Sequence, residues 1–130
     1  MPAPTVATYS VLALAAAQTS FRDLLDAGGG AGSIKIRDAA DVLLAVVPLS
    51  LPSGTVNGAT GQLTLTAAGR DESADASGTA SYGEFCDGDG AVHLSLPAQA
   101  GSGVVVGKLV INSLTIAAGD QVEVLAATVG

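Results

Sequence analysis

The chain has 130 residues, with twelve acidic side chains against five basic ones and a net charge of −7 at pH 7. Clustered Lys and Arg side chains bind nucleic-acid phosphates, but the five basic residues here are scattered, so we expect no nucleic-acid partner. The length suits one domain. With two Phe, two Tyr and no Trp, the core must come from Val, Leu, Ile and Ala.

The first nine residues, MPAPTVATY, contain two prolines and no strong hydrophobic period. Proline fixes its own φ and restricts the residue before it, which favours an extended arm. Terminal disorder is the other interpretation, and the composition leaves it open. We therefore divide the chain into an arm, residues 1–9, and a single domain, residues 10–130.

A helical pattern follows the arm. Phe21, Leu24 and Leu25 have the spacing of one helix face, and the three glycines that come next favour a helix end. The helix can reach back to Ser10, or residues 11–16 can form a strand, although their alanine content favours the helix. The apolar stretch after Ser10 is far too short to span a bilayer, so we expect no membrane partner.

From residue 32 onward the hydrophobic pattern changes to period two, which is typical of strands. Prolines in PLSLPSG (48–54) predict an edge or a crossing loop, and we also expect loops at RDAAD, GRDESADA and PAQAGSG. The segments that we predict as strands are SIKIR, VLLAVV, GQLTLTA, SGTASYGEF, AVHLSL, VVVGKLVI and two strands in NSLTIAAGDQVEVLAATV joined by a turn at Gly119–Asp120.

The number and spacing of these strands indicate the fold class. About eight short strands, with turns every eight to twelve residues, are typical of all-β domains. We predict a mainly β fold, an antiparallel β-sandwich or jelly roll with one short N-terminal helix. Strand spacing alone does not separate a sandwich from a barrel.

The most conspicuous chemistry lies in SADASGTASYGEFCDGDG, residues 73–90. An EF-hand loop counted from Asp87 has Asp89 at its third position, but its fifth and twelfth positions are Ala91 and Ala98, whose side chains have no oxygen. Asp-Gly steps between strand-like segments instead predict a hairpin turn. We predict no metal and no cofactor; the alternative is a calcium site at Asp87 and Asp89, helped by carboxylates of the preceding loop.

Two further side chains could carry chemistry. His93 is the only histidine, and no Gly-x-Ser-x-Gly motif identifies a serine partner, so we interpret it as a solvent-facing strand residue. Cys86 lies among Glu84, Asp87 and Asp89, which would raise the pKa of its thiol and make it a poor nucleophile. We interpret it as a small, partly buried residue at a strand end, and we predict no catalytic residues and no enzyme activity.

Two successions of segments stand out in the sequence. The helix FRDLLDAGGGAG leads into the strand SIKIRD, and GQLTLTA is followed by DESADASGTASYGEFCDGDGAVHL. This order of segments resembles that in small virion structural proteins of tailed bacteriophages. In that group a helix ending in AGGGAG precedes a basic-aliphatic strand, and a SADA-GTA segment precedes a strand that closes on a DGDG-type turn. The resemblance covers residues 18–96.

This resemblance implies a jelly-roll-like capsid cement, or decoration, protein on the outer surface of the phage head. Such a protein is made in the host cytoplasm, binds the major capsid protein and reinforces contacts between its subunits. It implies self-association as a dimer or trimer. The alternatives are a tail or head-tail accessory protein and a calcium- or carbohydrate-binding β-sandwich, although few aromatic rings are present for stacking on sugars.

Overall fold

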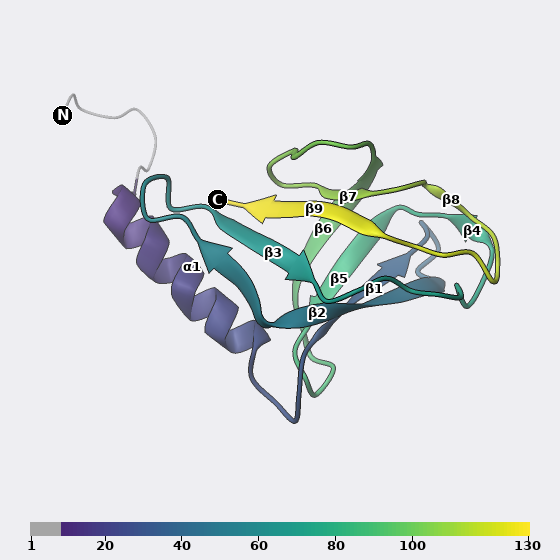
Figure 1. Cartoon of the computed structure of the whole chain (residues 1–130), viewed down its shortest axis with the longest axis horizontal. Coiled ribbons are helices and arrows are strands. Elements are labelled where there is room, and N and C mark those ends of the chain that lie inside the picture. Colours follow the sequence, from purple (N-terminus) through teal and green to yellow (C-terminus); the bar gives the residue numbers. More distant parts are fainter. Residues whose placement is uncertain (1–8) are drawn as a thin grey trace.

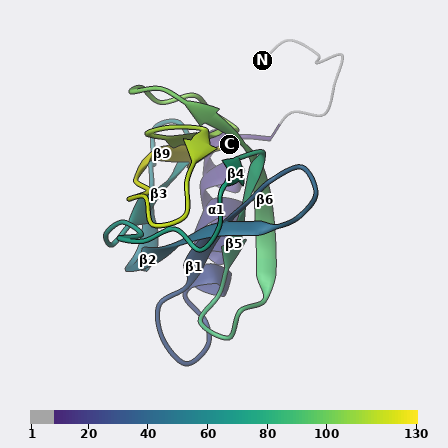
Figure 2. The ribbon, with the colours of Figure 1, turned by 90° about the vertical axis from the view of Figure 1, so that its right-hand side faces the viewer.

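The computed structural model describes residues 9–130 as a mainly β fold with one N-terminal helix. Helix α1 (Val11–Leu25) lies at one end of the molecule, and a small two-stranded sheet lies at the other (Figure 1). Figure 2, viewed from that second end, shows α1 behind the strands. The predicted arm lies outside the described residues except for Tyr9, so that prediction stays a prediction.

The longer of the two predicted helices is the correct one. The Ser10 hydroxyl accepts a hydrogen bond from the Ala13 amide, 3.1 Å away, and so caps the helix N-terminus. Leu25 is fully buried in the core and anchors the other end of the helix. Capping and burial therefore fix the helix where composition alone left a strand possible at residues 11–16.

Seven strands form a closed barrel in the order β1-β2-β3-β9-β7-β6-β5, and β4 pairs with β8 in a separate sheet. The barrel strands are antiparallel except for β6 and β7, which are parallel. The strand bounds are β1 Ser33–Arg37, β2 Leu43–Val56, β3 Leu63–Ala67, β4 Gly78–Thr79, β5 Tyr82–Cys86, β6 Val92–Ala100, β7 Leu109–Ile111, β8 Thr115–Ile116 and β9 Val124–Val129.

The prediction of a mainly β fold is confirmed. The prediction of an antiparallel sandwich or jelly roll is wrong, because the main sheet closes into a barrel that includes one parallel pair. Alternating strands present the same pattern to a sandwich core and to a barrel interior, so periodicity does not distinguish them. The pairing of β3 with β9 and of β6 with β7 closes the sheet into a barrel. Gly83 of β5 lies where any Cβ would overlap the Leu109 side chain of β7, so a small residue lets the wall approach the core.

Several predicted boundaries also change. PLSLPSG is not a separate loop, because β2 continues through it with an irregularity between Leu49 and Gly54. PAQAGSG begins inside β6, and VVVGKLVI contributes only its last residues to β7. The two strands predicted after residue 112 do not pair with each other, because β8 pairs with β4 and β9 joins the barrel.

The core of the barrel consists of aliphatic side chains packed around the aromatic ring of Phe85. Phe85 of β5 is the largest fully buried side chain, and Leu25 extends the core to the helix. Burying aliphatic surface of this kind contributes about 25 cal/mol per Å². The fully buried members besides Phe85 and Leu25 include Ile34, Ile36, Leu44, Val47, Leu49, Leu63, Leu109 and Ile111.

Candidate functional site

The residues around 73–90 are arranged as a structural turn. The Asp87 Oδ1 accepts hydrogen bonds from the amides of Asp89, at 2.9 Å, and Ala91, at 3.0 Å. Gly90 adopts a φ of 88°, which glycine tolerates, and its amide bonds the Asp87 carbonyl. The predicted Asp-Gly hairpin turn between β5 and β6 is therefore confirmed.

Further contacts hold this turn against the loop after the helix. The Gly88 amide donates to the Ala27 carbonyl at 2.9 Å, and the Gly29 amide lies 3.3 Å from the Asp89 Oδ1. Any Cβ on Gly88 would overlap the backbone of Gly30. The two glycine-containing loops therefore pack backbone to backbone.

His93 is not the solvent-facing residue that we predicted. Its Nε2 lies 2.8 Å from the Asp87 Oδ2, and its side chain keeps only a fifth of its surface exposed. The hydrogen bond to His93, together with the backbone amides, lowers the pKa of Asp87. Asp87 and Asp89 do lie in one turn, as proposed for the alternative calcium site, but Asp87 already binds two amides and the histidine.

Cys86 is more deeply buried than predicted. It is fully buried, and burial, more than the neighbouring carboxylates, raises the pKa of its thiol. Among residues 9–130, no group of three or more His, Cys, Asp or Glu side chains is placed to hold a metal ion. No helix in the same part of the chain has the length and apolar character needed to cross a membrane.

Acidic side chains hold other loops in the same way. The Asp71 Oδ2 accepts from the Val46 amide at 2.8 Å, which joins the acidic loop to β2. The Asp26 Oδ1 accepts from the Ser53 amide at 2.8 Å, which joins the helix end to β2. Asp38 and Asp120 close their own turns with similar bonds. Many of the acidic side chains therefore hold loops and turns in place by accepting hydrogen bonds from backbone amides.

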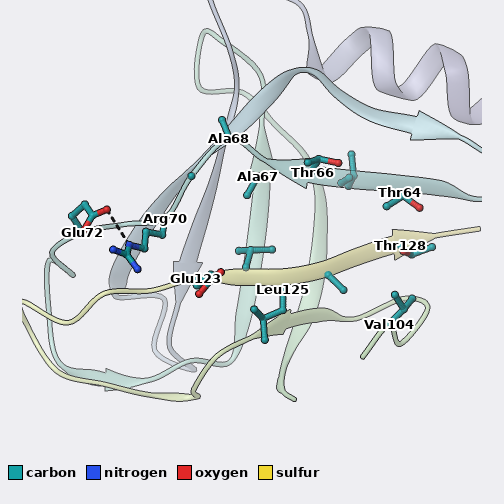
Figure 3. A pocket seen from close by; sticks show the side chains of 14 residues that line it. Thr64, Thr66, Ala67, Ala68, Arg70, Glu72, Val104, Glu123, Leu125 and Thr128 are labelled. Carbon is teal, nitrogen blue, oxygen red and sulfur yellow. Dashed lines mark hydrogen bonds and ion pairs between the residues drawn. The ribbon is translucent and has the colours of Figure 1, made fainter. Parts of the chain in front are cut away.

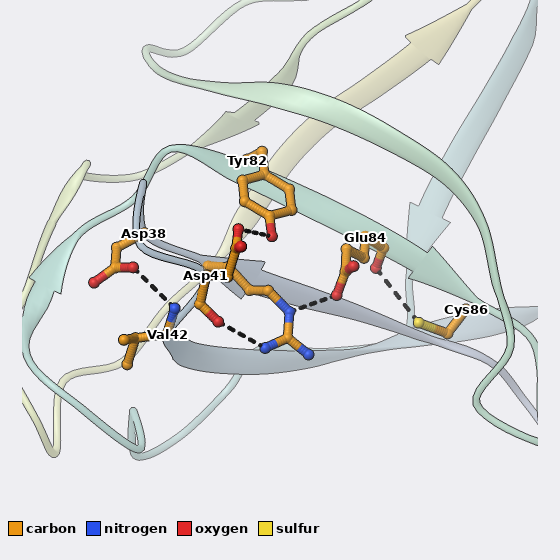
Figure 4. A network of polar contacts seen from close by, with 7 residues as sticks. Asp38, Asp41, Val42, Tyr82, Glu84 and Cys86 are labelled. Carbon is orange, nitrogen blue, oxygen red and sulfur yellow. Dashed lines mark hydrogen bonds and ion pairs between the residues drawn. The ribbon is translucent and has the colours of Figure 1, made fainter.

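A second polar network lies on the β1–β5 side of the barrel (Figure 4). Arg37 forms an ion pair with Glu84, and its Nη1 donates to the Asp41 carbonyl at 3.0 Å. The Tyr82 hydroxyl donates to the Asp41 Oδ1 at 2.7 Å, which raises the pKa of Tyr82 to about 12. Asp41 has a φ of 66°, so these bonds hold a turn residue in the left-handed region.

A cleft lies between β3 and β9 (Figure 3). These strands pair only at Leu63↔Val129 and Thr64↔Thr128. Beyond these pairs they diverge around a cleft of about 590 Å³, which we call the seam cleft. The segments that continue the two strands meet again at the antiparallel Asp71↔Val122 bridge. Its lining comprises Thr64, Leu65, Thr66, Ala67, Ala68, Gly69, Arg70, Glu72, Val104, Glu123, Val124, Leu125, Ala126 and Thr128.

The two ends of the seam cleft differ in chemistry. At the end closed by the Asp71↔Val122 bridge, Arg70 pairs with Glu72 at 3.0 Å, and Gln121 donates to the other Glu72 oxygen at 3.2 Å. Glu123 lines the same end (Figure 3). The other end narrows between Thr64 and Thr128, where the strands are still paired.

The outer margin of the seam cleft is aliphatic. Val104 is 63% exposed and Leu125 is 42% exposed, and both line the cleft. We call these two residues the apolar rim. Val104 belongs to the loop between β6 and β7, which is held beside β9 by a 2.8 Å bond from the Gly107 amide to the Thr128 carbonyl. A cleft between two strand edges, with an apolar rim, is suited to contact with polypeptide.

Sequence reasoning did not identify the seam cleft. The run Val104–Val106 looked like part of a strand, whereas it forms an exposed loop between Gly103 and Gly107. Gly107 has a φ of 82°. The sequence feature that could have indicated this loop is the position of the three valines between two glycines.

Comparisons with protein-family models, with curated proteins and with solved structures found no match for this chain.

Proposed function

We propose that the protein is a capsid cement protein of a tailed bacteriophage. It would bind the outer surface of the head and stabilise contacts between major capsid protein subunits. It would act through surface contact and carry no enzyme activity. The segment order over residues 18–96 supports this proposal, since it resembles small virion structural proteins.

The observation that carries the proposal is the apolar rim beside the seam cleft. Exposed aliphatic side chains on an otherwise acidic surface favour contact with another protein. Val104 and Leu125 lie next to strand edges, which can pair with an incoming backbone. The rim is therefore the surface that we assign to the capsid.

The loop anchors explain how a small barrel could serve as a rigid clamp. Asp26, Asp71 and Asp87 each fix a connecting segment through backbone amides, so little conformational entropy is lost when the protein binds. Repetition around a symmetric shell, with the protein acting as a dimer or trimer, would multiply a weak individual affinity.

Expanded heads assembled without this protein provide the test. Adding the purified chain should saturate a fixed number of sites per head and raise the temperature at which the heads release DNA. Leu125→Asp should weaken binding at least tenfold. Val92→Asp is the matched control, because Val92 is exposed to a similar extent, at 46%, and lies on β6.

Equal heat and chelator stability of heads with and without the protein would contradict the proposal. Labelling of the tail instead of the shell by a specific antibody would favour the tail or head-tail alternative.

A further inference from the structure

We propose that Asn57 is a site of spontaneous deamidation, in which the Gly58 amide nitrogen attacks the Asn57 side-chain amide. This inference goes beyond the proposed function, because it concerns a covalent change that requires neither a capsid nor an enzyme. Asn57–Gly58 is the only Asn-Gly step in the sequence and lies between β2 and β3. The other asparagine of the chain, Asn112, is followed by a serine.

The reaction has two steps. The Gly58 nitrogen bonds to the Asn57 Cγ and gives up its proton, while the side-chain nitrogen leaves as ammonia and a five-membered succinimide remains. Water then opens this ring. Attack of water at Cγ gives aspartate, and attack at the main-chain carbonyl carbon gives isoaspartate. Both products add one negative charge, and isoaspartate also adds a methylene to the main chain.

The turn polarises the Asn57 side chain for this attack. Attack on Cγ places negative charge on Oδ1, and hydrogen-bond donors that point at this oxygen stabilise that charge. The Oδ1 accepts from the Ala59 amide at 2.8 Å and from the Thr60 amide at 3.3 Å. Two backbone amides therefore lie at the oxygen where the charge develops.

The Gly58 amide is available as the nucleophile. Among the described residues it donates to no acceptor, whereas the amides of Ala59, Thr60 and Gly61 all donate hydrogen bonds. Glycine has no side chain to shield its nitrogen, and nothing lies within 4 Å of a Cβ at Gly58. Residues 57–60 are all exposed, so water reaches the ring that forms there.

The two Asp-Gly steps of the β5–β6 turn lack this freedom. The Gly88 amide donates to the Ala27 carbonyl at 2.9 Å, and the Gly90 amide donates to the Asp87 carbonyl at 3.0 Å. The lowered pKa of Asp87 keeps its carboxyl group ionised, and a carboxylate resists attack by a nucleophile. The structure therefore distinguishes Asn57–Gly58 from two steps that look equally reactive in the sequence.

Isoaspartate at this position would alter the turn. The Asn57 amide donates to the Gln62 carbonyl at 2.8 Å, and the Asn57 carbonyl accepts from the Gly61 amide at 2.7 Å. Gly61 also packs against Leu14 of α1. The added methylene would displace both hydrogen bonds, so modification should loosen the β2–β3 turn beside the helix.

Peptide mapping by mass spectrometry tests the proposal. The purified chain is incubated in mildly alkaline buffer, and the mass gain of deamidation is followed at both asparagines. We expect conversion of Asn57 at least tenfold faster than conversion of Asn112, whose side chain bonds the backbone of Gln121 and Glu123. Equal rates would overturn the proposal. So would isomerisation of Asp87 as fast as the conversion of Asn57.

Two further measurements separate this mechanism from simple hydrolysis. Electron-transfer fragmentation should identify isoaspartate at residue 57, because direct hydrolysis of the side chain gives aspartate alone. Gly58→Ala should slow the conversion at least fivefold, and the fold should persist because Gly58 does not have a positive φ. Absence of isoaspartate, or an unchanged rate in Gly58→Ala, would contradict the proposal. Capsid binding is not measured, so failure here leaves the cement proposal standing.

Discussion

The two sides of the barrel are built differently. On one side every residue of β1 pairs with β5, and the β5–β6 hairpin closes on the Asp87 turn. On the other side β3 and β9 pair only at two adjacent positions, and beyond the seam cleft their continuations meet only at the Asp71↔Val122 bridge. Strand pairing in the barrel is therefore continuous on one side and interrupted on the other.

This difference indicates where stability and binding reside. Buried apolar contacts and completed backbone hydrogen bonds stabilise the closed side, since unpaired buried groups would be costly. At the seam, strand edges and the apolar rim are accessible, and they are features that natural proteins otherwise cover. Substitutions on the two sides should therefore have different consequences.

The largest expected effect is from Phe85→Ala on the closed side. Phe85 is fully buried, and removal of its ring leaves a cavity in the core. We expect a loss of about 3–5 kcal/mol in the free energy of unfolding, measured by urea denaturation. Val104→Ala at the seam should change it by less than about 0.5 kcal/mol. Similar losses for the two variants would contradict the distinction between the sides.

The next largest effect is expected from Gly32→Ala, just before β1. An alanine Cβ there would overlap the Cys86 carbonyl oxygen, and neither backbone can move without disturbing the β1–β5 pairing. We expect a loss of about 1–3 kcal/mol in the same measurement. Gly58→Ala is the control, because nothing lies within 4 Å of a Cβ at that position. A neutral Gly32→Ala would show that the closed side is not tightly packed.

Asp87→Asn should have a pH-dependent effect. The pKa of Asp87 is lowered from its usual value of 3.8, chiefly by the bond to His93, so its ionised form stabilises the folded state. This contribution is present above pH 3.8 and is lost as the pH falls through the lower folded pKa. The Tm of the wild type should exceed that of Asp87→Asn at pH 6, and the difference should shrink below pH 3.8. A constant difference across that range would argue against the ionised carboxylate as its source.

Tyr82→Phe should have the smallest effect on stability and a clear spectroscopic one. The hydrogen bond to Asp41 raises the pKa of Tyr82 from 10.0 to about 12. Absorbance at the tyrosinate wavelength should therefore show a component that titrates near pH 12 in the wild type and not in the variant. The stability contributed by this bond is present below pH 10 and is lost as the pH rises through about 12. If Tyr82→Phe leaves the high-pH component in place, another group causes it.

Local patterns were sufficient to predict part of this structure. The spacing of Phe21, Leu24 and Leu25 located the helix, and the Asp-Gly steps after Cys86 located the β5–β6 turn. Both signals act between residues close in sequence, through helix periodicity and turn geometry. The alternation of Ile34 and Ile36 likewise gave the buried face of β1.

Other features depend on residues far apart in the chain. The seam cleft exists because β3 diverges from β9 after Thr64, and no property of either segment alone encodes that divergence. The contact of His93 with Asp87 required the bulge between Phe85 and Cys86, which shifts the register of β6. Periodicity predicts which face of a strand is buried but not which strand lies next to it.

The short pairing between β3 and β9 also has a kinetic consequence. Thr64 and Thr128 are separated by about half of the chain, so closing this contact costs more loop entropy than forming a local hairpin. We expect the two backbone pairs between β3 and β9 to form late in folding and to separate first during partial unfolding. The barrel would then pass through a state in which its other strands are ordered and β3 is not paired with β9.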